Sequence, residues 1–88
     1  MGSARPRPKR LAEKLLQIRR DLGLSQKQLV QSMGMEHVTP YRIISKYEHD
    51  KNEPPLDILL AYSKLAGICT DVLINDKLDL PKLKPLKK

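Results

Sequence analysis

The chain has 88 residues, and 17 lysines and arginines against 10 aspartates and glutamates give it a net charge of +7. One small domain with a modest core is expected at this length, which leaves no room for an enzyme's deep cleft and its supporting layer. The positive charge favours an anionic partner, such as nucleic acid or an acidic membrane. No apolar run approaches the length of a membrane span, and the single cysteine can form no internal disulfide. We therefore expect a cytoplasmic protein.

The positive charge is concentrated in the first half of the chain. Residues 1–51 contain 11 basic and 5 acidic side chains, residues 52–79 contain 2 and 5, and residues 80–88 contain 4 and none. The first half should therefore face the anion, helped by the C-terminal tail. The expected division is a basic flexible arm, a helical domain and a C-terminal extension, over residues 1–8, 9–75 and 76–88.

The first two predicted helices have clear start and stop signals. The first covers residues 9–22 and is followed by Gly23, a residue typical of helix C-termini. Its apolar residues recur at helical spacing and form one stripe, made of Leu11, Leu15, Ile18 and Leu22. The second covers residues 26–33, because Ser25 and Gln28 have the spacing of a capping box. A glycine again follows its end.

The third predicted helix begins at Thr39 as N-cap, with Pro40 at its first position. A helical wheel gives it an apolar face with Ile43, Ile44 and Tyr47. The opposite face spans about 140° of arc and carries Tyr41, Arg42, Ser45, Lys46 and His49. Such a face fits the major groove of DNA and offers donors to guanine and to phosphates. The alternative is a solvated charged face, which surface helices commonly have.

Two further helices complete an all-α prediction. Pro54 and Pro55 precede the fourth, over residues 56–66, which is the most apolar element because of Leu56, Leu59, Leu60 and Leu65. A short fifth helix covers residues 70–74, and no alternating β-branched run indicates a strand. The tail then mixes leucines, lysines and prolines. It could pair with a second subunit, pack back on the fifth helix or remain disordered.

Two stretches, taken together, carry a family resemblance. They are GLSQKQLVQSMG, residues 23–34, and IISKYEHDKNEPPLDILLAYSKLAGICTDVL, residues 43–73. Their ordered set resembles the Cro/C1-type (XRE) helix-turn-helix DNA-binding domains of phage repressors and bacterial regulators, over roughly residues 9 to 75. The resemblance implies a five-helix, lambda-repressor-like domain with its third helix in the major groove. It also implies a homodimer on a palindromic operator.

The resemblance assigns roles to particular side chains. Residues expected to read DNA bases are Tyr41, Arg42, Ser45 and Lys46. Residues expected to bind phosphates are Gln26, Lys27, Thr39, His49, Lys51 and Asn52, and Gln26 is also expected to brace the third helix. An ion pair with a structural role is expected between Arg19 and Glu48. Basic arms enter or flank the minor groove in other DNA-binding proteins, and the arm residues here are Arg5, Arg7, Lys9 and Arg10.

The sequence departs from the family between the second and third helices and after the third. The segment MEHV, residues 35–38, lengthens the turn that joins the two helices, so the family's tight turn is not expected. Asp50 stands where some relatives have a glycine. Aspartate tolerates left-handed backbone better than most residues do, so the loop can still form.

The expected function is that of a transcriptional regulator that binds double-stranded DNA sequence-specifically, as a repressor that occludes a promoter. The alternative is an antitoxin or adaptor whose main role is to bind a partner protein through the tail. RNA binding is less favoured, because the chain has no tryptophan or phenylalanine and only three tyrosines for base stacking. No enzyme, metal or cofactor is expected: His37, His49 and Cys69 match no zinc spacing, and no glycine-rich phosphate loop is present.

Overall fold

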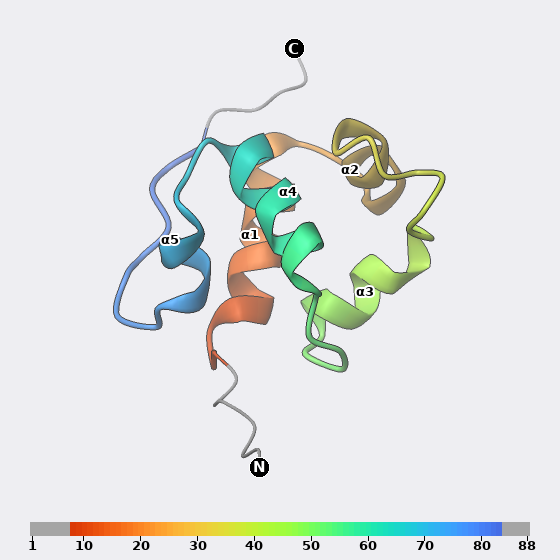
Figure 1. Ribbon diagram of the computed structural model, residues 1–88. Helices are drawn as coiled ribbons and strands as arrows, with labels where there is room; N and C mark the ends of the chain where they lie inside the picture. Colours follow the sequence, from red (N-terminus) through yellow and green to blue (C-terminus); the bar gives the residue numbers. More distant parts are fainter. Residues whose placement is uncertain (1–7, 84–88) are drawn as a thin grey trace.

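The computed structural model describes residues 8–83, and this part of the chain folds into five helices without a strand (Figure 1). The all-α five-helix prediction is therefore confirmed. The helices are α1 (Leu11–Leu22), α2 (Gln26–Ser32), α3 (Arg42–Glu48), α4 (Leu56–Ala66) and α5 (Thr70–Ile74). The bounds of α4 and α5 are those predicted, whereas α1 begins two residues later and α2 ends one residue earlier.

The core is built around α1, which packs against α3, α4 and α5. Its predicted apolar stripe is buried along its whole length, with no side chain of the stripe more than 5% exposed. From α4 the core receives Ile58, Leu59 and Tyr62, while Leu56 and Leu60 lie on the outside. The deep burial of Tyr62 raises the pKa of its hydroxyl, which has no hydrogen-bond partner within residues 8–83.

The predicted start of the third helix is wrong, because the lengthened turn forms a structure of its own. Thr39 does not cap α3: its N–H donates to the Met35 carbonyl at 2.8 Å and so belongs to the turn before the helix. The N–H groups of Ile43 and Ile44 then reach back three residues, which is a tighter turn than an α-helix makes. Tyr41 occupies the N-cap position without a side-chain cap. α3 therefore begins at Arg42, two residues after Pro40, the predicted first residue.

The end of α3 is closed by Asp50 in a left-handed conformation, with φ of 59°. The Lys51 N–H donates to the Lys46 carbonyl at 2.8 Å and the Asp50 N–H to the Tyr47 carbonyl at 3.3 Å. This pair of bonds is the Schellman motif, which usually places glycine at the left-handed position. Asp50 thus adopts the left-handed backbone that aspartate was expected to tolerate at this position.

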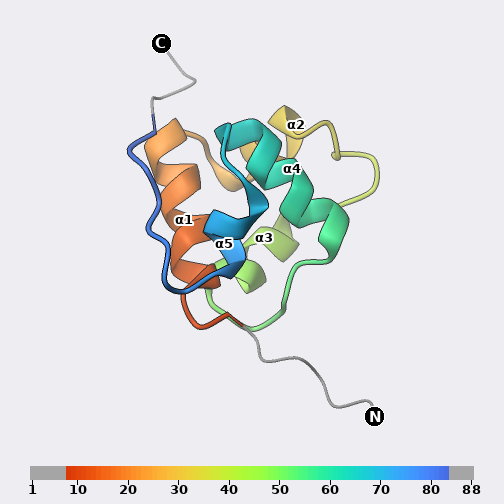
Figure 2. The ribbon, with the colours of Figure 1, turned by 60° about the vertical axis from the view of Figure 1, so that its left-hand side comes forward.

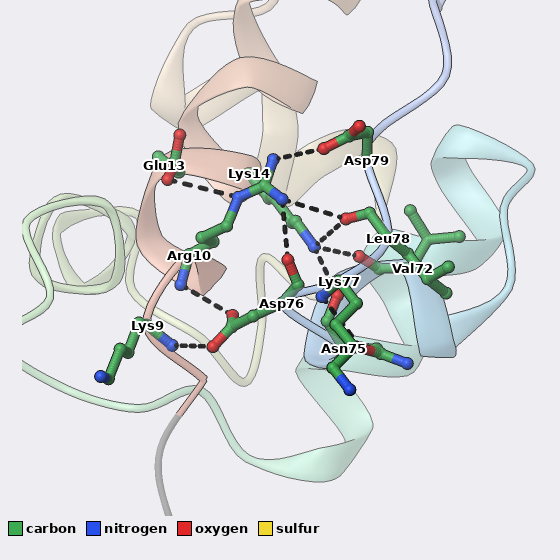
Figure 3. Close-up of polar contacts among 10 residues, drawn as sticks. All are labelled: Lys9, Arg10, Glu13, Lys14, Val72, Asn75, Asp76, Lys77, Leu78 and Asp79. Atoms are coloured by element: carbon green, nitrogen blue, oxygen red, sulfur yellow. Dashed lines mark hydrogen bonds and ion pairs between the residues drawn. The ribbon is translucent and has the colours of Figure 1, made fainter.

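The N-terminus of α1 is capped from the far end of the chain. Arg10, the local N-cap residue, provides no side-chain cap. Instead, the Asp76 carboxylate accepts hydrogen bonds from the N–H groups of Lys9 and Arg10 at 2.9 and 3.0 Å (Figure 3). A negative charge is favourable at this end of a helix. The two N–H groups in turn lower the pKa of Asp76.

The C-terminus of α5 is capped in the opposite direction by Lys14 of α1. This lysine is only 2% exposed, and its ammonium donates to the carbonyls of Val72, Asn75 and Leu78 at 2.7, 3.0 and 2.7 Å (Figure 3). The three bonds use all three N–H groups of the ammonium, which also suits the negative end of a helix. Burial nevertheless lowers the pKa of Lys14.

The described part of the C-terminal extension packs back on the domain, which was one of the three alternatives for the tail. Figure 2 shows the segment after α5 running along α1. Leu80 and Leu83 pack against the core, and the Arg10 guanidinium donates to the Asp76 carbonyl and pairs with the Asp79 carboxylate, both at 2.8 Å. The folded domain therefore continues through residue 83.

The Lys14 contacts predict a large loss of stability when the ammonium is removed. Lys14→Met keeps the apolar stem but leaves buried carbonyls without their donor, so we expect the free energy of unfolding to fall by about 3 kcal/mol. Lys77→Met, at an exposed lysine of the same region, should change it by less than about 0.5 kcal/mol. Urea unfolding followed by circular dichroism measures both values, and equal effects of the two substitutions would contradict the capping role.

Candidate nucleic-acid interface

The outer face of α3 carries most of the predicted base-reading residues. Tyr41 is 44% exposed, Arg42 and Lys46 are also exposed, and Ser45 is partly buried. Ile44 and Tyr47 on the other face are buried. Within residues 8–83 neither Arg42 nor Lys46 takes part in an ion pair. The two charges are therefore not neutralised inside the described part of the molecule.

His49, predicted to bind phosphate, is held against its own helix. Its Nδ1 lies 2.7 Å from the Ser45 carbonyl oxygen and 3.4 Å from the Ser45 hydroxyl. Because a carbonyl oxygen can only accept, Nδ1 carries the proton, and Nε2 is the ring nitrogen left for an external group. Ser45 is turned toward this local contact, which makes it a weaker candidate for base reading than Arg42 or Lys46.

The remaining predicted phosphate ligands lie at both ends of α3. Before the helix, a hollow of about 300 Å³ lies between α2 and the lengthened turn, and Lys27, Thr39 and Tyr41 line it together with His37. After the helix, Lys51 and Asn52 are exposed in the loop that follows the Schellman motif. The structure therefore brings polar and basic side chains to each end of the short helix, together with the acidic Glu36 in the hollow before it and Asp50 after it.

The orientation of α3 is fixed by a buried carboxylate. Glu48, whose side chain is 2% exposed, pairs with Arg19 of α1 through Oε2 to Nε at 2.7 Å and through Oε1 to Nη2 at 3.2 Å. Its Oε1 also accepts from the Gln26 side chain of α2 at 3.2 Å. The Arg19 guanidinium donates in addition to the Leu24 carbonyl at 3.0 Å. One carboxylate thus joins α1, α2 and α3, and the amide of Gln26 serves as the expected brace.

The predicted arm residues are not a single group in the structure. Arg5 and Arg7 lie outside the described residues. Lys9 is exposed, but Arg10 is bound to the C-terminal extension, so its guanidinium does not belong to a DNA-reaching arm. Lys14 was missed altogether as a structural residue. The signal was available, because Lys14 is three residues from Leu11 and four from Ile18 and thus lies on the buried stripe.

Comparison with known proteins assigns no family or function to these residues. No family model matches the chain, and no curated protein matches it. Among residues 8–83 there is no group of three histidine, cysteine or acidic side chains that could hold a metal ion. Over the same range, each helix is too short or too polar to cross a membrane.

The Glu48 contacts predict strong coupling between two substitutions. Glu48→Ala and Arg19→Ala should each lower the free energy of unfolding by about 3 kcal/mol, because each leaves a largely buried partner without its counter-charge. The double variant should lose clearly less than the sum of the two. Denaturant unfolding of all four proteins completes the cycle, with Glu13→Ala as control, since the exposed Arg10–Glu13 pair at 3.7 Å should contribute little. Additive losses would show that the pair is not coupled.

Proposed function

We propose that the protein is a transcriptional regulator that binds double-stranded DNA sequence-specifically and reads its operator through α3. The observation that carries the proposal is the outer face of α3, on which Arg42 and Lys46 are exposed without an ion-pair partner in the described part of the chain. A second support is the resemblance to Cro/C1-type (XRE) helix-turn-helix domains. A third is the excess of basic residues in the first half of the sequence.

The dimensions of α3 suit the major groove. An α-helix with its side chains is about 10 to 12 Å in diameter, and the major groove of B-form DNA is about 12 Å wide. Arg42 presents a planar fork of donors that matches the O6 and N7 acceptors of guanine. Lys46 lies one turn further on, about 6 Å along the helix axis, which corresponds to about two base pairs. The two side chains can therefore read different positions of one half-site.

Phosphate contacts on both sides of the groove would hold α3 in register. Lys27 and Thr39 beside the hollow before α3 provide an ammonium and a hydroxyl group, and Tyr41, which the sequence assigned to base reading, adds a second hydroxyl at the same place. Lys51 and Asn52 provide an ammonium and an amide after it. Phosphate contacts position a protein without reading sequence, whereas contacts to base edges provide specificity. The proposal therefore assigns affinity to the residues that flank α3 and specificity to Arg42 and Lys46 on its outer face.

The role of the tail as a binding segment for a partner protein is not supported by the described residues. Leu80 and Leu83 pack against the core of their own chain. In this arrangement the two leucines are partly buried against their own domain.

In vitro selection from random double-stranded DNA tests the proposal. At near-physiological salt we expect enrichment of a two-fold symmetric site, with half-sites about 34 Å or one helical turn apart, because each subunit presents one α3. The selection is carried out at two salt concentrations, since nucleic-acid affinities depend strongly on salt. If binding enriches no sequence and disappears steeply with salt, the net charge of +7 alone would explain the interaction.

Two substitutions should separate base reading from phosphate binding. Arg42→Ala should relax the preference at one or two base pairs, with a loss of discrimination of about 1 to 3 kcal/mol. Lys51→Ala should weaken all sequences to a similar extent and reduce the salt slope by about one. Binding titrations on matched and mismatched sites distinguish the two patterns, and Lys77→Ala serves as control for the loss of one charge on a distant surface. An unchanged sequence preference in Arg42→Ala would exclude the reading role of this residue.

A further inference from the structure

The outer face of α4 exposes leucines that the core does not use. Leu56 is 69% and Leu60 is 48% exposed, although the inner face of the same helix fills the core with Ile58, Leu59 and Tyr62. Leu60 also lines a hollow of about 440 Å³, together with the end of α2. Its lining residues are Ser32, Met33, Asp57, Leu60, Ala61, Lys64 and Leu65. A grouped apolar surface with charged residues at its borders is typical of an interaction site.

The two charged residues of this face are placed symmetrically about the midpoint between Leu60 and Ala61. Asp57 lies as far before that midpoint as Lys64 lies after it, and the seven-residue spacing makes about two helical turns, so both lie on the same side of α4. Along the helix axis, Asp57 and Lys64 are about 10 Å apart. Opposite charges at symmetric positions are complementary to the same surface turned around, which is the requirement for a two-fold interface between identical chains.

We propose that the outer face of α4 is the self-association surface, at which a second copy of this chain packs its own α4 in antiparallel orientation. In that arrangement Asp57 of each copy faces Lys64 of the other, so that the interface contains two ion pairs. Leu60 lies next to the two-fold axis, so the Leu60 side chains of the two copies meet at the centre. Only the purpose of this dimer, which is to place two copies of α3 on one operator, rests on the proposed function.

The size of the surface predicts weak pairing. The 11 residues of α4 form a helix about 16 Å long. One face of so short a helix has a much smaller area than the roughly 800 Å² that each partner contributes to a standard interface. Met33 and Ser32 at the end of α2 enlarge the surface only at its border. A weak dimer in free solution is compatible with operator binding, because two adjacent half-sites raise the effective concentration of the second subunit.

Charge reversal tests the arrangement with the full chain in the absence of DNA. Asp57→Lys places lysines at both symmetric positions, and Lys64→Asp places aspartates there, so in either variant both facing pairs repel. Sedimentation equilibrium at low ionic strength, where exposed charges are least screened, should show the association constant of each variant reduced by about tenfold or more. An equimolar mixture of the two variants should recover association, because every facing pair is then of opposite sign.

Asp71→Lys is the matched control for the change in charge. Asp71 is exposed in the first turn of α5, as Asp57 is in the first turn of α4, so the two substitutions make the same change of charge at the start of a helix. Asp57→Lys also removes the hydrogen bond that the Asp57 carboxylate accepts from the Ile58 N–H at 2.9 Å. We expect Asp71→Lys to leave association unchanged. Leu60→Ala should weaken association without charge reversal, and circular dichroism verifies that all variants are folded.

Three outcomes would overturn the proposed surface. They are a native chain that stays monomeric up to about 1 mM, single reversals that associate like the native chain, and a mixture that associates no better than its components. The outcome of the DNA selection experiment does not depend on these association measurements. A chain that dimerises through α4 but enriches no DNA sequence would contradict the proposed function alone, whereas a symmetric site bound by an α4-independent dimer would contradict the surface alone.

Discussion

The arrangement of the first three helices depends on the carboxylate of Glu48. It lies at the C-terminal end of α3, is almost completely buried, and is bound by a guanidinium from α1 and an amide from α2. A seven-residue helix is too short to be stable by itself in water. The direction in which α3 presents Arg42 and Lys46 is therefore set by this carboxylate together with the burial of Ile44 and Tyr47. A buried charge tolerates little displacement, because a shift would leave it without its partners.

The other side of the domain is closed by exchange of helix caps between α1 and the C-terminal extension. Asp76 provides acceptors for the N–H groups before α1, and Lys14 provides donors for the carbonyls at the end of α5. Each charge has the sign that its helix end favours. A domain of this size buries a modest apolar surface, so such polar closure has a considerable share in holding the last helix. It also explains why Arg10 is part of the fold and not of a free arm.

Local signals in the sequence were sufficient for most of the fold. The capping box of Ser25 and Gln28, the left-handed glycines and the leucine spacing of α1 all act within a few residues, and each has the predicted structure. The predicted start of α3 was wrong, because the N–H of Thr39, a good N-cap by type, donates to the Met35 carbonyl in the turn that contains the MEHV segment. The contacts of Asp76 with Lys9 and Arg10 span more than sixty residues of sequence, and no local pattern indicates them. The ion pair of Arg19 and Glu48 is also distant, but the family resemblance suggested it.

The fold divides the basic residues into two groups that composition cannot distinguish. Arg10, Lys14 and Arg19 are bound to carboxylates or carbonyls within the domain, so their charges are largely compensated or buried. Lys27, Arg42, Lys46 and Lys51 are exposed and are in no ion pair with any residue from 8 to 83. All four belong to α2, α3 or the loop after α3. The other exposed basic residues without an ion pair to any residue from 8 to 83 are spread over the rest of the domain; they are Lys9, Arg20, Lys64, Lys77 and Lys82. The net charge alone would favour any anionic surface. The group of four around one short helix is the part of that charge that the proposed reading of a DNA groove uses.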